Sequence, residues 1–419
     1  HHGVYMQRES AYRAETPLRS KKSHRPGVPS PLHCANLIRQ NKPAVVPMED
    51  SRFLPRNALQ TLFDVLNRQG FRTLGPVVRD GAIQYLDLSD ADRLPGGWTD
   101  EQSPGSYRLN ANESARCFAW ANGPQALKPW LFSARETLWK TRRDGSGSLT
   151  FDAQPMKERP LALIGARACD LAALALQDKH FLDGVRDPYY AARRQNLFFV
   201  AVHCTHPAET CFCASTGDGP RATHNFDLAL SELDHGYLIE IGSERGQTIA
   251  MQLPLQVPEN RLRQEADEEI TEAGRRQQRQ LPSRNLRDAL FDRLEHPHWE
   301  EVAARCLSCG NCTSVCPTCF CHAQLDLPEL GGASSQHVRE WDSCFSEGHS
   351  YLHGFLVRPE TRHRYRQWLT HKLGSWHEQY RRSGCVGCGR CITWCPVGID
   401  ITAETKAICD DDALHGGSA

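Results

Sequence analysis

Two runs of consecutive apolar residues stand out in the middle of the chain. Residues 160–165 read PLALIG and residues 196–202 read NLFFVAV, and short continuous runs of this kind predict buried strands. Residues 169–182, which lie between them, have the length and composition of a helix. Continuous apolar strands that alternate with helices are typical of a parallel sheet covered on both faces. The pattern therefore predicts an α/β domain in the N-terminal part of the chain, with a mainly parallel sheet.

Weaker patterns flank this core on both sides. Residues 59–67 are amphipathic, because Leu59, Leu62, Phe63 and Leu66 fall on one helical face. Further strands are expected at 71–78, 82–88, 225–230 and 237–242. Further helices are expected at 258–280 and at 286–294.

The C-terminal part of the chain contains one cysteine signature twice. The cysteines of its two copies are Cys306, Cys309, Cys312 and Cys316, followed by Pro317, and Cys385, Cys388, Cys391 and Cys395, followed by Pro396. This spacing is that of bacterial ferredoxins with two [4Fe-4S] clusters. Gly310, Gly387 and Gly389 suit a backbone that wraps closely around such a cluster.

Each copy of the signature is expected to serve both clusters. Three thiolates on a tight loop can bind three corners of one cubane, whereas the fourth cysteine of such a run ligates the other cluster. One cluster is therefore assigned to Cys306, Cys309, Cys312 and Cys395, and the other to Cys316, Cys385, Cys388 and Cys391. A zinc ribbon or a disulfide framework is the alternative, but zinc sites usually combine two separated pairs of cysteines.

Four more cysteines follow the two predicted core strands. Cys169 lies just after the first strand in the sequence GARACDL, and Cys204 directly follows the second. Cys211 and Cys213 close the segment HCTHPAETCFC. Ligand sites of an open parallel sheet form outside the carboxyl ends of its strands, and the start of a helix at Cys169 favours an anionic thiolate. These four cysteines are therefore predicted to hold a third [4Fe-4S] cluster, with inert buried thiols as the alternative.

Six cysteines remain outside these sets. Three of them follow the first copy of the signature: Cys319, Cys321 and Cys344. They are one thiolate short of the set that a cubane takes, and His322 or His349 could complete it, but they could equally be structural thiols. The other three stand alone and are expected to be ordinary residues: Cys34, Cys117 and Cys409.

The bulk composition excludes several classes of protein. The net charge of −1 indicates no general affinity for nucleic acid, and no apolar run reaches the length of about 18 residues that a membrane span needs. Eighteen cysteines without a segment resembling a secretory signal indicate a reducing, cytoplasmic compartment, in which thiols bind metals. Nucleotide-binding and hydrolytic motifs are absent. This combination is expected of a non-catalytic subunit that conducts electrons between centres on other chains.

The segment 358–382 is rich in arginine, histidine and aromatic residues. We expect an amphipathic helix there that packs Tyr365, Trp368 and Leu369 inward. A cationic docking face for an acidic partner is the alternative.

Composition and motifs together divide the chain into five segments. The first is polar and basic and then rich in proline, which is typical of a flexible arm. The segments are a basic flexible arm (1–40), an α/β domain with the third iron–sulfur site (41–255), a helical connector (256–298), a helical two-[4Fe-4S] ferredoxin-like domain (299–410) with an insertion (317–384), and a tail (411–419).

Several of these motifs together resemble one family. They are CLSCGNCTSVCPTCFC from Cys306, WDSC ending at Cys344, GCVGCGRC ending at Cys391, GARACDL around Cys169 and TCFC ending at Cys213. They are similar to those of the beta subunit of cytoplasmic sulfhydrogenases, a family that also includes the A subunit of anaerobic sulfite reductase. The resemblance covers about residues 40–410 and leaves the role of the basic arm open.

The resemblance implies an iron–sulfur subunit of a hetero-oligomer. Its partners would be the large and small subunits of a [NiFe] hydrogenase and a flavin subunit that handles NAD(P). Clusters pass electrons singly whereas nicotinamide takes a hydride, so a flavin on another chain would convert between the two. The same scaffold could instead serve sulfite or polysulfide reduction, and a stand-alone sensor or scaffold protein is a third interpretation.

Overall fold

The apolar runs at 160–165 and 196–202 form neighbouring strands inside a seven-stranded sheet. The computed structural model describes residues 50–125, 127–153 and 159–410. The predicted basic arm (1–40), Cys34 and the predicted tail (411–419) lie outside the described residues. The sheet has the order β1 (Arg52–Pro55), β11 (Gly236–Ile241), β10 (Leu228–Leu233), β9 (Leu197–Val202), β8 (Leu161–Ala166), β2 (Arg72–Arg79) and β3 (Ala82–Asp87).

Only the inner strands of this sheet are parallel. β10, β9, β8 and β2 run in one direction, whereas β1, β11 and β3 are joined to the sheet by antiparallel pairings. The N-terminal part therefore contains a mixed sheet rather than a mainly parallel one. β2 and β3 are connected by Asp80 and Gly81, whose φ angles of 50° and 73° suit a tight two-residue hairpin. An Asp-Gly pair is typical of such a turn, so it indicates that β3 joins β2 as an antiparallel strand at the edge of the sheet.

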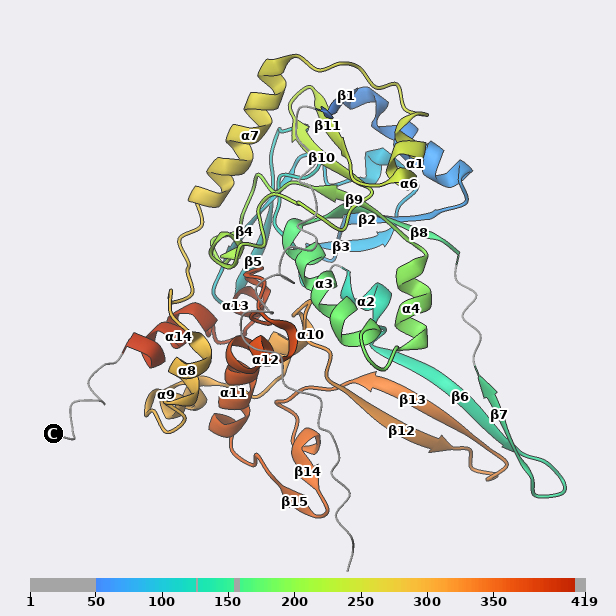
Figure 1. The fold of residues 1–419 in the computed structure, drawn as a ribbon, viewed down its shortest axis with the longest axis vertical. Coiled ribbons are helices and arrows are strands. Elements are labelled where there is room, and N and C mark those ends of the chain that lie inside the picture. Colours follow the sequence, from blue (N-terminus) through green and yellow to red (C-terminus); the bar gives the residue numbers. More distant parts are fainter. Residues whose placement is uncertain (1–49, 126, 154–158, 411–419) are drawn as a thin grey trace, which may run out of the picture. The chain divides into compact units, whose positions relative to one another are not determined.

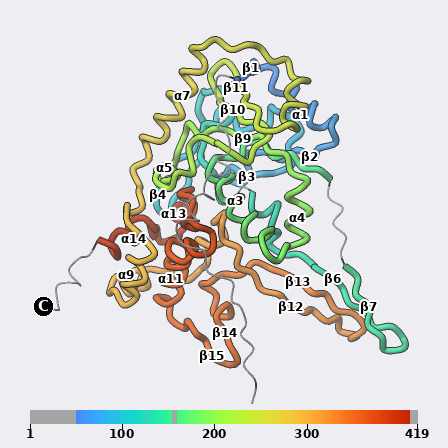
Figure 2. Tube along the Cα trace, in the orientation of Figure 1, coloured from blue at the N-terminus to red at the C-terminus, as the bar shows by residue number. Residues whose placement is uncertain are grey.

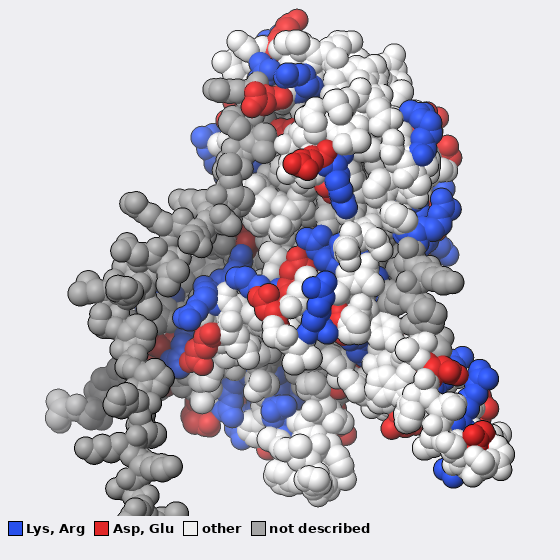
Figure 3. All heavy atoms as spheres, turned by 45° about the vertical axis from the view of Figure 1, so that its right-hand side comes forward, with Lys and Arg blue, Asp and Glu red and all other residues white. Residues whose placement is uncertain are grey.

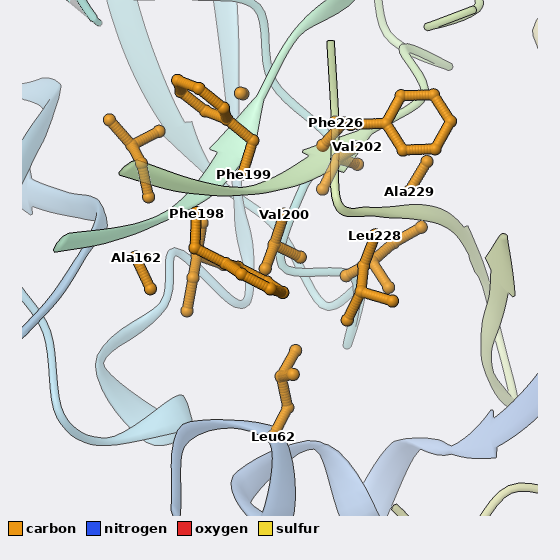
Figure 4. Close-up of a cluster of buried hydrophobic side chains, with 14 of the residues drawn as sticks. Leu62, Ala162, Phe198, Phe199, Val200, Val202, Phe226, Leu228 and Ala229 are labelled. Carbon is orange, nitrogen blue, oxygen red and sulfur yellow. The ribbon is translucent and has the colours of Figure 1, made fainter. Parts of the chain in front are cut away.

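Helices cover both faces of the sheet (Figure 1). The helices concerned are α1 (Leu59–Arg68) and α6 (Glu244–Ala250) on one face, and α3 (Ala168–Leu182), α4 (Pro188–Gln195) and α7 (Asn260–Arg275) on the other. Figure 4 shows Leu62 of α1 pointing toward Phe198 and Leu228, while Phe199 projects from the opposite side of its strand. Every residue of β9 is consequently buried, as expected of a continuous apolar run between two layers.

The part of the chain that carries the two cysteine signatures contains several short helices. They are α8 (Leu286–Phe291), α9 (His298–Arg305), α10 (Asn311–Ser314), α11 (Thr361–Thr370), the π-helical turn η6 (His371–Ser375), α12 (Trp376–Tyr380), α13 (Arg390–Thr393) and α14 (Ile401–Asp410). They enclose a second apolar core that includes Trp299 and Ile408. Tyr365, Trp368 and Leu369 of α11 are buried in this core, as the amphipathic pattern predicts.

The remaining elements are short. They are η3 (Arg56–Ala58), η4 (Ala91–Arg93), the hairpin β4 (Trp98–Ser103) and β5 (Ser106–Ala111), α2 (Lys128–Leu131), α5 (Cys213–Thr216), η5 (Gly348–Ser350), and the hairpin β14 (Tyr351–Leu352) and β15 (Phe355–Leu356). The division of the chain into an α/β domain, a connector and a ferredoxin-like domain stays a prediction. α7 and α8 occupy the predicted connector.

A second sheet joins two distant parts of the chain. Its strands have the order β12 (His322–Pro328), β13 (Ser334–Trp341), β6 (Arg135–Arg143) and β7 (Leu149–Ala153), and all its pairings are antiparallel. Figure 1 and Figure 2 show the two hairpins lying side by side. The predicted insertion (317–384) is therefore bound by direct backbone pairing to a hairpin that lies between β3 and β8 in the sequence.

Three buried charges fix the junction of the two hairpins. Arg193 of α4 donates to Glu136 of β6 at 2.8 Å, and Arg339 of β13 contacts the other oxygen of the same carboxylate. These side chains are only 9%, 8% and 3% exposed for Arg193, Glu136 and Arg339. Buried charges of this kind are stable only while all partners are present.

The charged residues at the surface are mixed in sign. On the face shown in Figure 3, lysine and arginine side chains lie among aspartate and glutamate side chains. This distribution agrees with a net charge of −1 for the whole chain. None of the helices within the described ranges is long and apolar enough to cross a membrane.

We predict that Glu136→Ala destabilises the fold by about 3 kcal/mol, because it leaves two buried guanidinium groups without their shared carboxylate. Urea unfolding followed by circular dichroism measures this change. Asp152→Ala is the matched control, since Asp152 pairs with Arg142 at 3.7 Å on the exposed part of the same sheet. The control should shift the unfolding free energy by less than about 1 kcal/mol, and equal losses in both variants would contradict the prediction.

Candidate metal centres

Five cysteines line one cavity in the C-terminal part of the chain. Four of them are the set assigned above to one cluster, which we call the first ferredoxin group: Cys306, Cys309, Cys312 and Cys395. The fifth is Cys391, whereas Cys316 does not line this cavity. The fourth cysteine of the second signature thus turns toward the first three cysteines of the other. This lining supports the crossed assignment.

Glycines shape the loops that carry these thiols. Gly310 has a φ of 74° and opens α10, the short helix that carries Cys312. In the second signature Gly387 and Gly389 have φ angles of 63° and 73°. Positive φ is unfavourable for any residue with a Cβ. The glycines therefore allow each loop to turn its thiols and its N–H groups toward one point.

The cavity also contains unused hydrogen-bond donors. Tyr365 and Trp368 of α11 line it together with the cysteines. The Tyr365 hydroxyl and the Trp368 Nε1 are buried and have no hydrogen-bond partner among the described residues. Buried donors without partners are rare and often face a bound group that completes them. Donors of this kind suit the sulfur atoms of an iron–sulfur cluster, whose potential depends on such hydrogen bonds.

The second set assigned to a cluster, the second ferredoxin group, is more deeply buried. Its members are Cys316, Cys385, Cys388 and Cys391. Burial raises the pKa of Cys391 well above its usual value, and the neighbouring thiols of Cys385 and Cys388 raise it further. Burial also raises the pKa of Cys385 to about 12, with the thiol of Cys316 adding to the effect. Iron binds the deprotonated thiolate, so cluster binding would release the protons that such thiols hold.

The structure brings the four predicted N-terminal ligands together at the ends of two core strands. This N-terminal group consists of Cys169 in the first turn of α3, Cys204 after β9, and Cys211 and Cys213 at the start of α5. Burial raises the pKa of Cys213 to about 12, and the adjacent thiol of Cys204 contributes. Gln277 donates to the sulfur of Cys213 at 3.3 Å. The grouping supports a third cluster, which stays a prediction.

The N-terminal group lies directly against the second ferredoxin group. The N–H of Phe212 donates to the carbonyl of Gly387 at 2.8 Å, and the sulfur of Cys211 lies 3.9 Å from the carbonyl oxygen of Cys388. A Cβ at Gly387 would lie 2.5 Å from the backbone of Phe212, and one at Gly389 would lie 2.5 Å from the backbone of Thr210. The two loops therefore touch through their backbones, and no side chain separates them at these points.

A buried arginine occupies the same junction. Arg390 is 1% exposed and donates to Asp170 at 2.7 Å. Its Nη1 has no hydrogen-bond partner among the described residues. Burial alone would lower the pKa of Arg390. Asp170 and the thiols of Cys388 and Cys169 nevertheless raise it above its usual value. A cation at this place would offset the negative charge that thiolate-bound clusters bring into the interior.

The other cysteines fall into two kinds. Cys319, Cys321 and Cys344 lie near one another and near the second ferredoxin group. Cys409 is buried within α14, and Cys117 contacts the backbone of Ala115. Within the described ranges, no three His, Cys, Asp or Glu side chains are close enough together to bind a single metal ion. A cubane spaces its ligands more widely than one ion does, so this finding concerns mononuclear sites.

Sequence reasoning missed the polar and aromatic residues around the thiols. Lys128, Lys372 and Arg390 are buried beside the cysteines, and Tyr365 and Trp368 complete the first cavity. Arg390 lies within the second signature, and the two aromatic residues lie within the predicted helix. Motifs in the sequence therefore indicated part of the surroundings of the thiols. The two lysines lie in no motif, and only the folded chain shows where they point.

The cysteine groups and the helices that carry them define a class of iron–sulfur protein. A family model described as a 4Fe-4S dicluster domain matches residues 305–399, and another of the same description matches residues 270–320. The protein therefore binds [4Fe-4S] clusters in its C-terminal part, which confirms the predicted cofactor. No solved structure matches the chain.

One curated relative identifies the family more closely. The chain is 32% identical over 335 residues to sulfhydrogenase 2 subunit beta of Pyrococcus furiosus, across 78% of this chain and 90% of the relative. The chain belongs to the sulfhydrogenase beta subunit family. This confirms the resemblance inferred from the motifs and, with the dicluster match, an iron–sulfur electron-transfer role.

The crossed assignment predicts which cluster a single substitution damages. Cys316→Ser should remove or convert the cluster at Cys385, Cys388 and Cys391. It should spare the cluster of the first ferredoxin group, although Cys316 is closer to that group in the sequence. Anomalous iron density in crystals of the anaerobically purified variant measures this. Cys312→Ser is the control and should damage the other cluster. Damage to the same cluster in both variants would refute the crossed ligation.

The backbone contact at Gly387 predicts a loss of stability on substitution. Gly387→Ala should lower the free energy of unfolding by more than about 1 kcal/mol, because alanine disfavours the positive φ and its Cβ would meet Phe212. Gly145→Ala is the control, since no atom lies within 4 Å of a Cβ there, and its effect should stay within about 0.5 kcal/mol. Urea unfolding of both variants measures the change. An unchanged free energy of unfolding in Gly387→Ala would show that the two loops can separate.

Proposed function

We propose that this protein relays electrons between a [NiFe] hydrogenase module and a flavin subunit that handles NAD(P). Its relative, sulfhydrogenase 2 subunit beta, supports a place in a complex of this kind. The observation that carries the proposal is the direct contact of the N-terminal group with the second ferredoxin group, where the Cys211 sulfur lies 3.9 Å from the Cys388 carbonyl oxygen. Candidate clusters at these two places would have no other element between them.

The proposed path continues into the first ferredoxin group. Cys391 is a predicted ligand of the second cluster, yet it lines the cavity of the first group. Cys312 of the first group in turn acts on the pKa of Cys391. The three groups of thiols thus form an unbroken series from the end of the α/β sheet to the cavity beside α11.

The protein's own residues would hold and tune this path. Bound [4Fe-4S] clusters supply one-electron chemistry. Arg390 places a buried cation at the junction of two groups, and Tyr365 and Trp368 direct donors into the cavity of the first group. Cations and hydrogen-bond donors stabilise the more negative, reduced state of a centre. Burial of most thiols keeps water away from them.

The proposal includes partners and a compartment. We infer that the large and small hydrogenase subunits bind near one end of the series and the flavin subunit near the other. Every cysteine among the described residues is a free thiol, which supports a reducing cytoplasm as its compartment. Purification of the native complex with identification of its subunits tests this part. A sirohaem subunit in place of the hydrogenase pair would assign the protein to sulfite reduction instead.

The relay predicts that a ligand substitution uncouples the complex. Cys388→Ser should lower hydrogen-dependent reduction of NAD(P) at least about ten-fold, because electrons could no longer cross between the N-terminal and ferredoxin groups. Hydrogen oxidation with an artificial dye should stay largely intact, since it needs only the hydrogenase module. Both activities are measured on the intact purified complex, with Cys117→Ser as the control.

Two outcomes would contradict the relay. Equal loss of both activities in an intact complex would mean that this protein takes part in the chemistry itself. Unchanged coupled turnover would mean that the second ferredoxin group lies off the electron path.

A further inference from the structure

Three thiols near the second ferredoxin group have no part in the proposed relay. Cys319 and Cys321 follow the first signature directly, and Cys344 lies three residues after β13. The antiparallel pairing of β12 with β13 places His322 opposite Trp341. The N–H of Asp342 then donates to the carbonyl of Cys321 at 3.0 Å. The end of this hairpin consequently brings Cys344 back to Cys321.

A histidine completes the group. Cys344 and His349 lie beside Cys321, and Cys319 lies close enough to Cys321 to interact with it electrostatically. The Nδ1 of His349 lies 2.7 Å from a carboxylate oxygen of Asp342. A carboxylate on one ring nitrogen orients the other nitrogen toward a metal and makes it a better ligand. The donor set is therefore three thiols and one oriented imidazole.

Two buried lysines lie beside this group of side chains. Lys128 and Lys372 are only 6% and 4% exposed. Lys128 donates to the carbonyl of Thr313 at 3.2 Å and stacks on the ring of Trp341, and Lys372 donates to Thr318 at 2.9 Å. Neither forms an ion pair with a carboxylate among the described residues. Buried cations need an anionic partner.

Cysteines lie beside both lysines. Thr318, which accepts from Lys372, lies 3.2 Å from the sulfur of Cys316, and Cys316 and Cys319 lie close enough to both lysines to interact with them electrostatically. Lys372 lies in the π-helical turn η6, a distortion that often occurs at functional sites. Cys319 belongs to neither ferredoxin group, and cations buried beside it would offset the negative charge that a thiolate-bound cluster brings into the interior.

We infer that Cys319, Cys321, Cys344 and His349 hold a further iron–sulfur cluster beside the second ferredoxin group. Three cysteines and a histidine also suit zinc. The wider spacing of a cluster is favoured, because no three such residues among the described ranges are close enough for one metal ion. If the proposed relay is correct, this centre adjoins both ferredoxin groups, since Cys319 contacts Cys316 and Cys344 lies near Cys312.

Metal analysis of the full chain, expressed and purified anaerobically, tests the inference without any partner. The variants are His349→Ala, His349→Cys, Cys321→Ser and the control Cys117→Ser. Cys321→Ser and His349→Ala should each lose up to about four iron atoms per chain relative to the unaltered protein and the control. His349→Cys should keep the iron and change the electron paramagnetic resonance spectrum of the reduced protein, because a thiolate replaces an imidazole.

The two His349 variants are the decisive test, because replacing this half-buried side chain should disturb folding less than replacing a buried cysteine. Unchanged iron and an unchanged spectrum in both His349 variants would overturn the inference, as would zinc at this site in the unaltered protein. Iron analysis separates this result from the relay. A protein that keeps its ferredoxin clusters but shows no change at His349 refutes only this site, whereas the relay fails only in the assay of the assembled complex.

Discussion

A buried ion pair holds the α/β part of the chain against the ferredoxin loops. Asp170, in the first turn of α3, accepts hydrogen bonds from Arg390 at 2.7 Å and from Asn122 at 2.8 Å. Both partners of the ion pair are almost completely buried, so removing either would leave an uncompensated charge. Asp170 directly follows Cys169, and Arg390 lies two residues after Cys388. This ion pair, together with the backbone hydrogen bond from Phe212 to Gly387, therefore holds the N-terminal group beside the second ferredoxin group.

Local sequence patterns predicted the elements on both sides of this contact. The apolar runs at 160–165 and 196–202 correspond to β8 and β9, and the helix expected at 169–182 is α3. The spacing of the two signatures predicted that Cys395 would join the cysteines of the first copy, which the lining of the cavity supports. These features could be predicted because hydrophobic periodicity and ligand spacing are properties of short segments.

The features that could not be predicted depend on residues far apart in the chain. The pairing of β6 with β13 joins strands separated by almost half of the sequence, and neither segment has an apolar run that marks it. No pattern in the sequence indicated that Lys128 or Lys372 is buried, because only the tertiary structure buries them. The mixed character of the sheet comes from its hairpins, because the β2–β3 and β10–β11 pairings are antiparallel.

The pairing of β6 with β13 also bears on how electrons would leave the chain. A strand of the predicted insertion pairs with a strand that lies between β3 and β8 in the sequence, and Arg193, Glu136 and Arg339 hold the base of this ladder. Regions joined in this way cannot swing apart about a hinge. Electron tunnelling weakens steeply with distance, so constant separations would let transfer inside the chain proceed without waiting for a domain motion. Any conformational gating of the flow would then have to act where this subunit meets its partners.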